Sequence, residues 1–148
     1  MSTQVAIIGA GPAGLLLSHL LDLQGIESVV VERCDRDYVE HRVRAGVLEH
    51  GTVQTLREAG VAKRLDAEGI GHDGLQVRFN RHTHRLDLEE LVGRCVTIYG
   101  QQEVVKDLIT ARLDSGGDVR FCVEDVTLHD LGGTRPYVTF LDNGRGTR

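Results

Sequence analysis

The chain has 148 residues, 41% of them hydrophobic and 26% charged, a balance typical of one soluble globular domain. Its formal net charge of -5 excludes a global basic field for holding nucleic acid or an anionic membrane surface. Three scattered cysteines exclude a disulfide framework and fit a reducing cytoplasm, and the N-terminal apolar run Val5–Ile8 is too short for a signal peptide or a membrane span.

The N-terminal segment predicts a βαβ unit. Gln4–Ile8 is a short apolar run that ends at a glycine, which is typical of a buried parallel strand. A leucine-rich helix follows from Pro12, a residue that the first helical turn tolerates, and stops near Gly25. Ser28–Glu32 is a second apolar strand. Strand, glycine turn, helix and strand in this order form the βαβ motif.

The later elements follow from hydrophobic periodicity and turn residues. Arg33–Arg44 is expected to be irregular because it is polar and charged. We expect helices at Gly46–Ala59 and Gln102–Leu113, a hairpin of Leu75–Phe79 and Arg85–Leu88, a strand at Cys95–Tyr99, and β runs at Val119–Val123, Val126–Leu131 and Tyr137–Leu141. The predicted fold class is α/β, a Rossmann-like βαβ unit with additional helices and a β meander. Asp142–Gly144 is a hairpin-turn signal with no returning strand, so we expect the fold to be incomplete at its C-terminus.

The turn after the first strand, residues 9–14, fits the pattern G-x-G-x-x-G. In this pattern Gly9 permits a tight turn, Gly11 lets the backbone approach a pyrophosphate, and Gly14 lets the helix pack close to the strand. The helix N-terminus offers N–H groups and a positive dipole end to the phosphates. Because a strand leads in and a helix leads out, the motif predicts binding of the ADP half of a dinucleotide.

Glu32 ends the second strand, about twenty residues past the glycines, where an acid accepts hydrogen bonds from ribose hydroxyls. A negative charge there also repels a 2′-phosphate, so this unit is predicted to bind FAD or NAD rather than NADP. The alternative to a binding site is a glycine turn that arose by chance, followed by a surface glutamate. The spacing and the flanking strands disfavour this alternative.

Longer segments carry a family resemblance. They are Val5–Leu17, Val31–Arg33, Arg42–Glu49, Leu56–Val61, Tyr99–Gln101, Leu128–Leu131 and Arg135–Phe140. Together they resemble the class A flavoprotein aromatic hydroxylases, and within them the branch that acts on 4-hydroxybenzoate. The resemblance covers nearly the whole chain, and Arg42–Gly46 is more specific than the glycine motif.

The resemblance implies a FAD-dependent monooxygenase that hydroxylates a phenolic acid, with O2 and NAD(P)H, and that is a homodimer when full length. Gly9, Gly11, Gly14 and Glu32 would hold the ADP half of FAD, Arg44 would lie near the pyrophosphate, and Gln101 near the ribityl chain. The full set of expected cofactor-binding residues is Gly9, Gly11, Gly14, Glu32, Arg33, Tyr38, Arg42, Val43, Arg44, Ala45, Gly46, Val47 and Gln101. No catalytic residue and no metal site is expected in this segment.

The resemblance also bears on the reductant. The positions where the family meets the reducing pyridine nucleotide are matched by Arg33, Tyr38, Arg42 and Arg44. Arg33 and Tyr38 fit the pattern of NADPH-using members, whereas Asp35 and Asp37 would oppose a 2′-phosphate. We expect NADPH, with NADH as the alternative.

The family's second FAD motif, an Asp-Gly pair, and its substrate domain would follow beyond Arg148. We therefore expect residues 1–148 to be the N-terminal part of the FAD-binding domain, with the substrate domain absent from this chain. This segment alone is expected to be inactive.

Other interpretations stay open. A disulfide reductase is disfavoured because the sequence has no Cys-x-x-x-x-Cys or Cys-x-x-Cys pair, and a nucleotide-binding segment that only packs against a partner would show no catalysis. His82 and His84 would share a strand face, but the lack of an evident third ligand favours an exposed hairpin over a metal. Cys34 is predicted to be a passive thiol, since no partner base is visible. On spacing alone, Gln101 is an ordinary polar residue.

Overall fold

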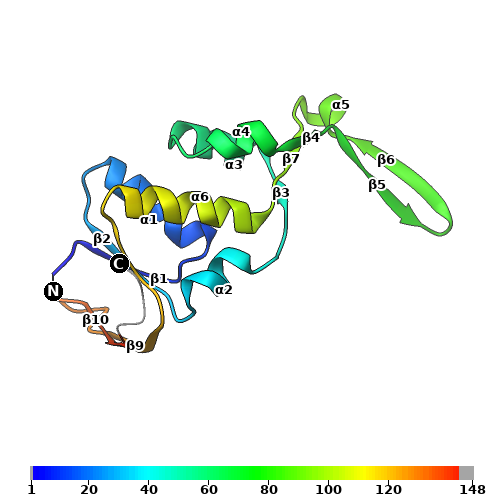
Figure 1. Cartoon of the computed structure of the whole chain (residues 1–148). Helices are drawn as coiled ribbons and strands as arrows, with labels where there is room; N and C mark the ends of the chain where they lie inside the picture. The colour runs from blue at the N-terminus through cyan, green and yellow to red at the C-terminus, as the bar shows by residue number, and fades with distance from the viewer. Residues whose placement is uncertain (1, 144–148) are drawn as a thin grey trace. The chain divides into compact units, whose positions relative to one another are not determined.

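The computed structural model describes residues 2–143 and divides the chain into two compact units (Figure 1). The first unit comprises Met1–Arg42 and Val105–Arg148, and the second comprises Val43–Val104. Helix α6 (Gln101–Asp114) begins in the second unit and continues in the first. Within residues 2–143, no helix combines the length and the apolar character that crossing a bilayer requires.

The first unit is built on a parallel sheet with strand order β1-β2-β8. Its strands are β1 (Val5–Ile8), β2 (Ser28–Val31) and β8 (Asp118–Arg120), and α1 (Pro12–Leu23) connects β1 to β2. All four residues of β2 are buried, which explains why the central strand has an apolar run in place of an alternating pattern. The predicted βαβ unit is confirmed.

Helices α1 and α6 lie side by side in the first unit (Figure 1), and a buried arginine joins them. Arg112 on α6 is 2% exposed, donates from Nε to Ser18 Oγ at 2.9 Å and pairs through Nη1 with Asp22 Oδ2 at 2.7 Å. Ser18 Oγ also lies 2.9 Å from Ser28 Oγ on β2. Because these partners satisfy the guanidinium, the buried charge is tolerated and ties both helices to the sheet.

The last strands differ from the predicted meander. Strand β8 pairs in parallel with β2, and only β9 (Val123–His129) and β10 (Tyr137–Asp142) form an antiparallel pair. Their Val126 and Phe140 pack on the core residues Val29, Val31 and Val123. Helix α6 brings the chain back alongside β2, and such a crossover makes the next strand parallel. Of the predicted turn at 142–144, Asp142 ends β10 and Gly144 lies outside the described residues.

A short helix replaces the predicted irregular stretch after β2. Helix α2 (Arg36–His41) begins at Asp35, whose Oδ1 accepts a hydrogen bond from the Tyr38 N–H at 2.7 Å. An aspartate at this position satisfies an N–H group that the helix itself leaves unpaired. The prediction of irregular structure was wrong here because a helix of six residues, with Tyr38 and Val39 as its hydrophobic residues, is too short to show a hydrophobic periodicity.

The second unit holds an antiparallel sheet of order β3-β7-β4, made of β3 (Val47–Leu48), β7 (Val96–Ile98) and β4 (Ile70–His72). Helices α3 (His50–Glu58) and α4 (Lys63–Glu68) lie between β3 and β4 in the chain. The predicted helix from Gly46 therefore begins later, because Val47 and Leu48 pair with β7 instead.

The predicted hairpin of the second unit is confirmed as β5 (Gly74–Phe79) and β6 (His82–Asp87), followed by α5 (Leu88–Val92). Its turn is Asn80-Arg81, both with positive φ, at 49° and 63°. Two such residues form the tight turn that matches the twist of a hairpin. The connection is shorter than the predicted strand bounds imply, because His82, Thr83 and His84 belong to β6.

Candidate dinucleotide-binding site

The turn between β1 and α1 has the geometry that its glycines predict. Gly9 has a φ of +107°, a conformation that L side chains rarely adopt, and its N–H donates to Val31 O at 2.8 Å. A Cβ on Gly14 would lie 2.2 Å from Gly9 O and 3.1 Å from Ile7 Cγ2. Helix α1 can therefore start this close to β1 only with a glycine at residue 14.

The N-terminus of α1 has no side-chain cap, and the space beside Gly11 is unoccupied by described atoms. Gly11 is the N-cap, with no side chain to bond the first-turn N–H groups, and Pro12 begins the helix. A Cβ on Gly11 would meet no described atom within 4 Å, and its φ of -77° suits any residue. Packing within the described chain thus does not require a glycine at residue 11. The uncapped N–H groups are suited to an anionic ligand.

Glu32 connects this turn to the end of β2. Its Oε2 accepts a hydrogen bond from the Ala10 N–H at 2.9 Å, and its Oε1 accepts one from the Cys34 N–H at 2.9 Å. The carboxylate is therefore held in one orientation beside the glycine turn. Each carboxylate oxygen offers two lone pairs, so both retain capacity to accept a hydrogen bond from a hydroxyl group.

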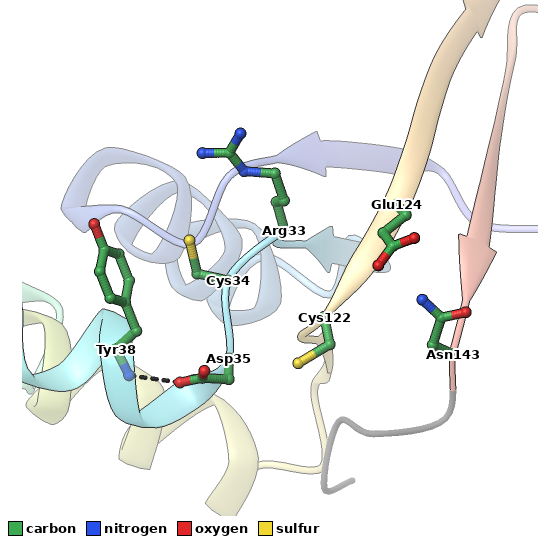
Figure 2. Close-up of a pocket in the computed structure, with 7 residues that line it drawn as sticks. All are labelled: Arg33, Cys34, Asp35, Tyr38, Cys122, Glu124 and Asn143. Carbon is green, nitrogen blue, oxygen red and sulfur yellow. Dashed lines mark hydrogen bonds between the residues drawn. The ribbon is translucent and has the colours of Figure 1, made fainter.

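A pocket of about 570 Å³ is lined by residues that begin directly after Glu32 in the chain (Figure 2). The residues that line it are Arg33, Cys34, Asp35, Tyr38, Cys122, Glu124 and Asn143. One cation and two carboxylates face it, so its lining is polar with a small negative excess. The volume is in the range of small-molecule sites.

Helix α2 brings two further predicted residues together. The guanidinium carbon of Arg42 lies 5.4 Å from the centroid of the Tyr38 ring, within the range of a cation–π contact. Tyr38 remains 46% exposed and lines the pocket with Arg33. Two nearby carboxylates already have partners, since Asp35 caps α2 and Asp37 lies 3.2 Å from His41 Nδ1.

The second unit joins two predicted segments that are far apart in the sequence. Ala45 O accepts a hydrogen bond from the Gln101 N–H, and Gly46 O accepts one from the Tyr99 N–H, both at 2.9 Å. A Cβ on Gly46 would lie 3.5 Å from Gly100 Cα, so the two backbones are in contact. The other predicted residues of this segment, Val43, Arg44 and Val47, are exposed.

One histidine of β6 makes an aromatic contact within the hairpin. His84 stacks on the Phe79 ring with centroids 4.7 Å apart, and the described part of the chain contains no group of three or more residues suited to a metal ion.

Sequence analysis missed Cys122, Glu124 and Asn143 as pocket residues. They come from the far end of the chain, and no local pattern marks them.

A parallel βαβ unit with a glycine turn, an uncapped helix N-terminus and an acid after the second strand defines a dinucleotide-binding protein. The family model described as FAD binding domain matches residues 2–148. The chain belongs to this family.

Individual relatives agree with this assignment. The chain is 48% identical to p-hydroxybenzoate hydroxylase of Acinetobacter baylyi over 97% of its own length, but it spans only 36% of that protein. A solved structure of BexE, from work on oxidation during BE-7585A biosynthesis, matches 96% of the chain and 30% of BexE with a TM-score of 0.74 and 26% identity. p-Nitrophenol 4-monooxygenase PnpA of Pseudomonas putida matches 95% of the chain and 39% of its own with a TM-score of 0.73; at 18% identity this shows the fold alone.

Proposed function

We propose that this chain is the N-terminal part of the FAD-binding domain of a monooxygenase that hydroxylates 4-hydroxybenzoate to 3,4-dihydroxybenzoate with NAD(P)H and O2. The observation that carries the proposal is the 48% identity to p-hydroxybenzoate hydroxylase across 97% of the chain. Because the chain spans 36% of that relative, the substrate domain is proposed to lie outside it, and residues 1–148 alone are proposed to be inactive.

The first unit is proposed to hold the ADP half of FAD. The N–H groups at the start of α1 suit the pyrophosphate, and Gly11 leaves the space in front of them open. The oriented carboxylate of Glu32 suits the ribose hydroxyls. The pocket lined by Arg33 is the next space along the chain and has room for an adenosine.

Residues of the second unit are proposed to contact the flavin side. When bound, FAD accepts a hydride from the pyridine nucleotide and supplies the oxygen chemistry. Ala45 and Gly46 form a backbone surface that their hydrogen bonds to Gln101 and Tyr99 hold in place. The exposed guanidinium of Arg44 suits bidentate contact with phosphate oxygens, and the Gln101 carboxamide suits a ribityl hydroxyl.

The proposed reductant is NADPH, contacted by Arg33, Tyr38, Arg42 and Arg44. The choice of NADPH is supported by Arg33 and Tyr38, which fit the pattern of NADPH-using members and both line the pocket. The carboxylates of Asp35, which caps α2, and Asp37, which lies beside His41, would oppose a 2′-phosphate. Steady-state rates with NADPH and NADH at equal concentrations test this choice.

The location and the oligomeric state are also proposals. The cysteine content favours a cytoplasmic location, and the homodimer is proposed from the family resemblance alone.

The test uses the full-length protein that contains this sequence. It should purify yellow, oxidise NADPH faster when 4-hydroxybenzoate is added, and release 3,4-dihydroxybenzoate detectable by chromatography. Faster NADPH oxidation with another phenol and none with 4-hydroxybenzoate would contradict the substrate only. A colourless protein that binds NAD would contradict the flavoenzyme itself and favour a nicotinamide-dependent enzyme or a nucleotide-binding module.

A further inference from the structure

Two cysteines that are far apart in the sequence meet at the pocket beside Glu32. The Cys122 N–H donates a hydrogen bond to Cys34 O at 3.1 Å, so the two backbones are direct neighbours. Both side chains line the same pocket, as Figure 2 shows, and both are partly exposed. The third cysteine, Cys95, belongs to the second unit and is also partly exposed.

An irregularity in the β2–β8 pairing places Cys122 at the pocket. Parallel pairing continues past β2 with the Glu32 N–H donating to Arg120 O at 2.8 Å. Glu32 O then accepts from the Val123 N–H at 3.0 Å, which leaves Cys122 as an extra residue with a φ of +59°. Such a bulge redirects a side chain, and a positive φ at a non-glycine residue concentrates at functional sites.

We propose that Cys34 and Cys122 form a redox-sensitive pair whose disulfide closes the pocket. Hydrogen peroxide oxidises one thiol to a sulfenic acid and releases water; the other thiolate attacks that sulfur, forms the S–S bond and releases a second water. Two thiols and one peroxide thus give one disulfide and two waters, and the peroxide is reduced.

The backbone geometry permits this bond. The Cys122 N–H to Cys34 O hydrogen bond of 3.1 Å keeps the two Cα atoms within about 7 Å, because the amide N lies about 1.5 Å and the carbonyl O about 2.4 Å from its own Cα. Disulfides span Cα separations of roughly 4.4–6.8 Å. In Figure 2 the two sulfurs point to different parts of the pocket, so a side-chain rotation must precede bond formation. The bond would draw both side chains into the space that the proposed function gives to the adenosine, and the effect on FAD therefore rests on that function.

The first measurement needs no ligand. The full-length protein is reduced, treated with one equivalent of hydrogen peroxide, alkylated and mapped by peptide mass spectrometry. The expected result is a Cys34–Cys122 crosslink with Cys95 still alkylated as a free thiol. Thermal unfolding should shift upward, because a crosslink between residues this far apart restricts the unfolded chain. Equal oxidation of all three cysteines without this crosslink would overturn the proposal.

The second measurement compares FAD affinity before and after peroxide. The oxidised protein should bind FAD at least about tenfold more weakly, and dithiothreitol should restore it. In Cys34→Ser and Cys122→Ser the ratio of oxidised to reduced affinity should be near one, whereas the control Cys95→Ser should respond as the parent does. A crosslink that leaves FAD affinity unchanged would overturn pocket closure. If the reduced parent fails to bind FAD, the proposed function fails, and the peptide map still decides the crosslink.

Discussion

The carboxylate of Glu32 accepts a hydrogen bond from the backbone N–H of Ala10 at 2.9 Å, which links the end of β2 to the glycine turn after β1. Ala10 is fully buried, so its N–H depends on the Glu32 carboxylate for a hydrogen bond. The same carboxylate accepts from the Cys34 N–H through its second oxygen. Glu32 therefore shapes the site in the absence of any ligand, and its proposed contact with a ribose is an additional role.

Replacing Glu32 should weaken both the fold and FAD binding. Glu32→Ala leaves a buried N–H without a partner and should lower the free energy of unfolding by about 1–3 kcal/mol. Glu32→Gln retains one acceptor oxygen and should lose less. Urea unfolding and FAD titration measure the two effects. If neither variant changes FAD affinity, the ribose role is wrong, whatever happens to stability.

Gly14→Ala and Gly11→Ala should separate packing from ligand binding. A Cβ at residue 14 collides with Gly9 O at 2.2 Å, so Gly14→Ala should destabilise the fold by about 1–3 kcal/mol. A Cβ at residue 11 meets no described atom within 4 Å, so Gly11→Ala should fold normally and bind FAD more weakly. Unfolding curves and FAD titration of both variants check this. Normal FAD affinity in Gly11→Ala would contradict a pyrophosphate at the start of α1.

Arg112→Ala should destabilise the first unit more than the loss of an exposed ion pair does. Arg112 is buried between α1 and α6, and its removal costs roughly 3 kcal/mol by analogy with broken buried pairs. The matched control is Arg57→Ala, whose partner Asp66 and guanidinium are both about half exposed, with an expected loss below about 1 kcal/mol. Equal unfolding free energies of the two variants would show that the Arg112 network contributes nothing specific.

The pairing of Asp22 with Arg112 predicts a pH dependence of stability. Burial acts to raise the pKa of Asp22, but the hydrogen bond and the charge of Arg112 outweigh it and hold that pKa below its ordinary value. A lowered folded-state pKa means that the stabilisation is complete above the unfolded value of about 3.9 and is lost as the pH falls through the folded value.

The comparison of the parent with Asp22→Asn isolates this contribution. The free energy of unfolding should differ between them at pH 7, and the difference should shrink as the pH is lowered below about 4. Because Asp22 is more than a third exposed, water screens the pair and the difference at pH 7 should be modest. A difference that stays constant down to pH 2.5, or grows, contradicts the coupling.

Arg44→Ala in the full-length protein should weaken FAD binding and slow reduction by NADPH. Arg44 is exposed, so its loss should leave the unfolding free energy nearly unchanged. Stopped-flow reduction and FAD titration are the measurements, and Arg78→Ala on the exposed strand β5 is the control for loss of one positive charge. Reduction at the parent rate would remove Arg44 from the proposed site.

Prediction from the sequence succeeded where a pattern is local and long enough. The glycine turn with its flanking strand and helix, the β5–β6 hairpin and α6 each carry their own periodicity or turn residues. It failed at α2 and β3, which are six and two residues long. An N-terminal cap at Asp35 was the available signal for α2, but a capping residue without an apolar stripe also occurs in loops.

The sequence by itself determined the ADP-binding βαβ unit and its acid at residue 32, because their chemistry depends on residues close together in the chain. Only the tertiary structure decided that β8 lies parallel to β2, that Ala45 meets Gln101, and that Cys122 shares a pocket with Cys34. Each of these joins segments more than fifty residues apart through backbone hydrogen bonds. Backbone groups are nearly the same at every residue, so the partner of each segment follows from how the whole chain packs and cannot be read from that segment alone.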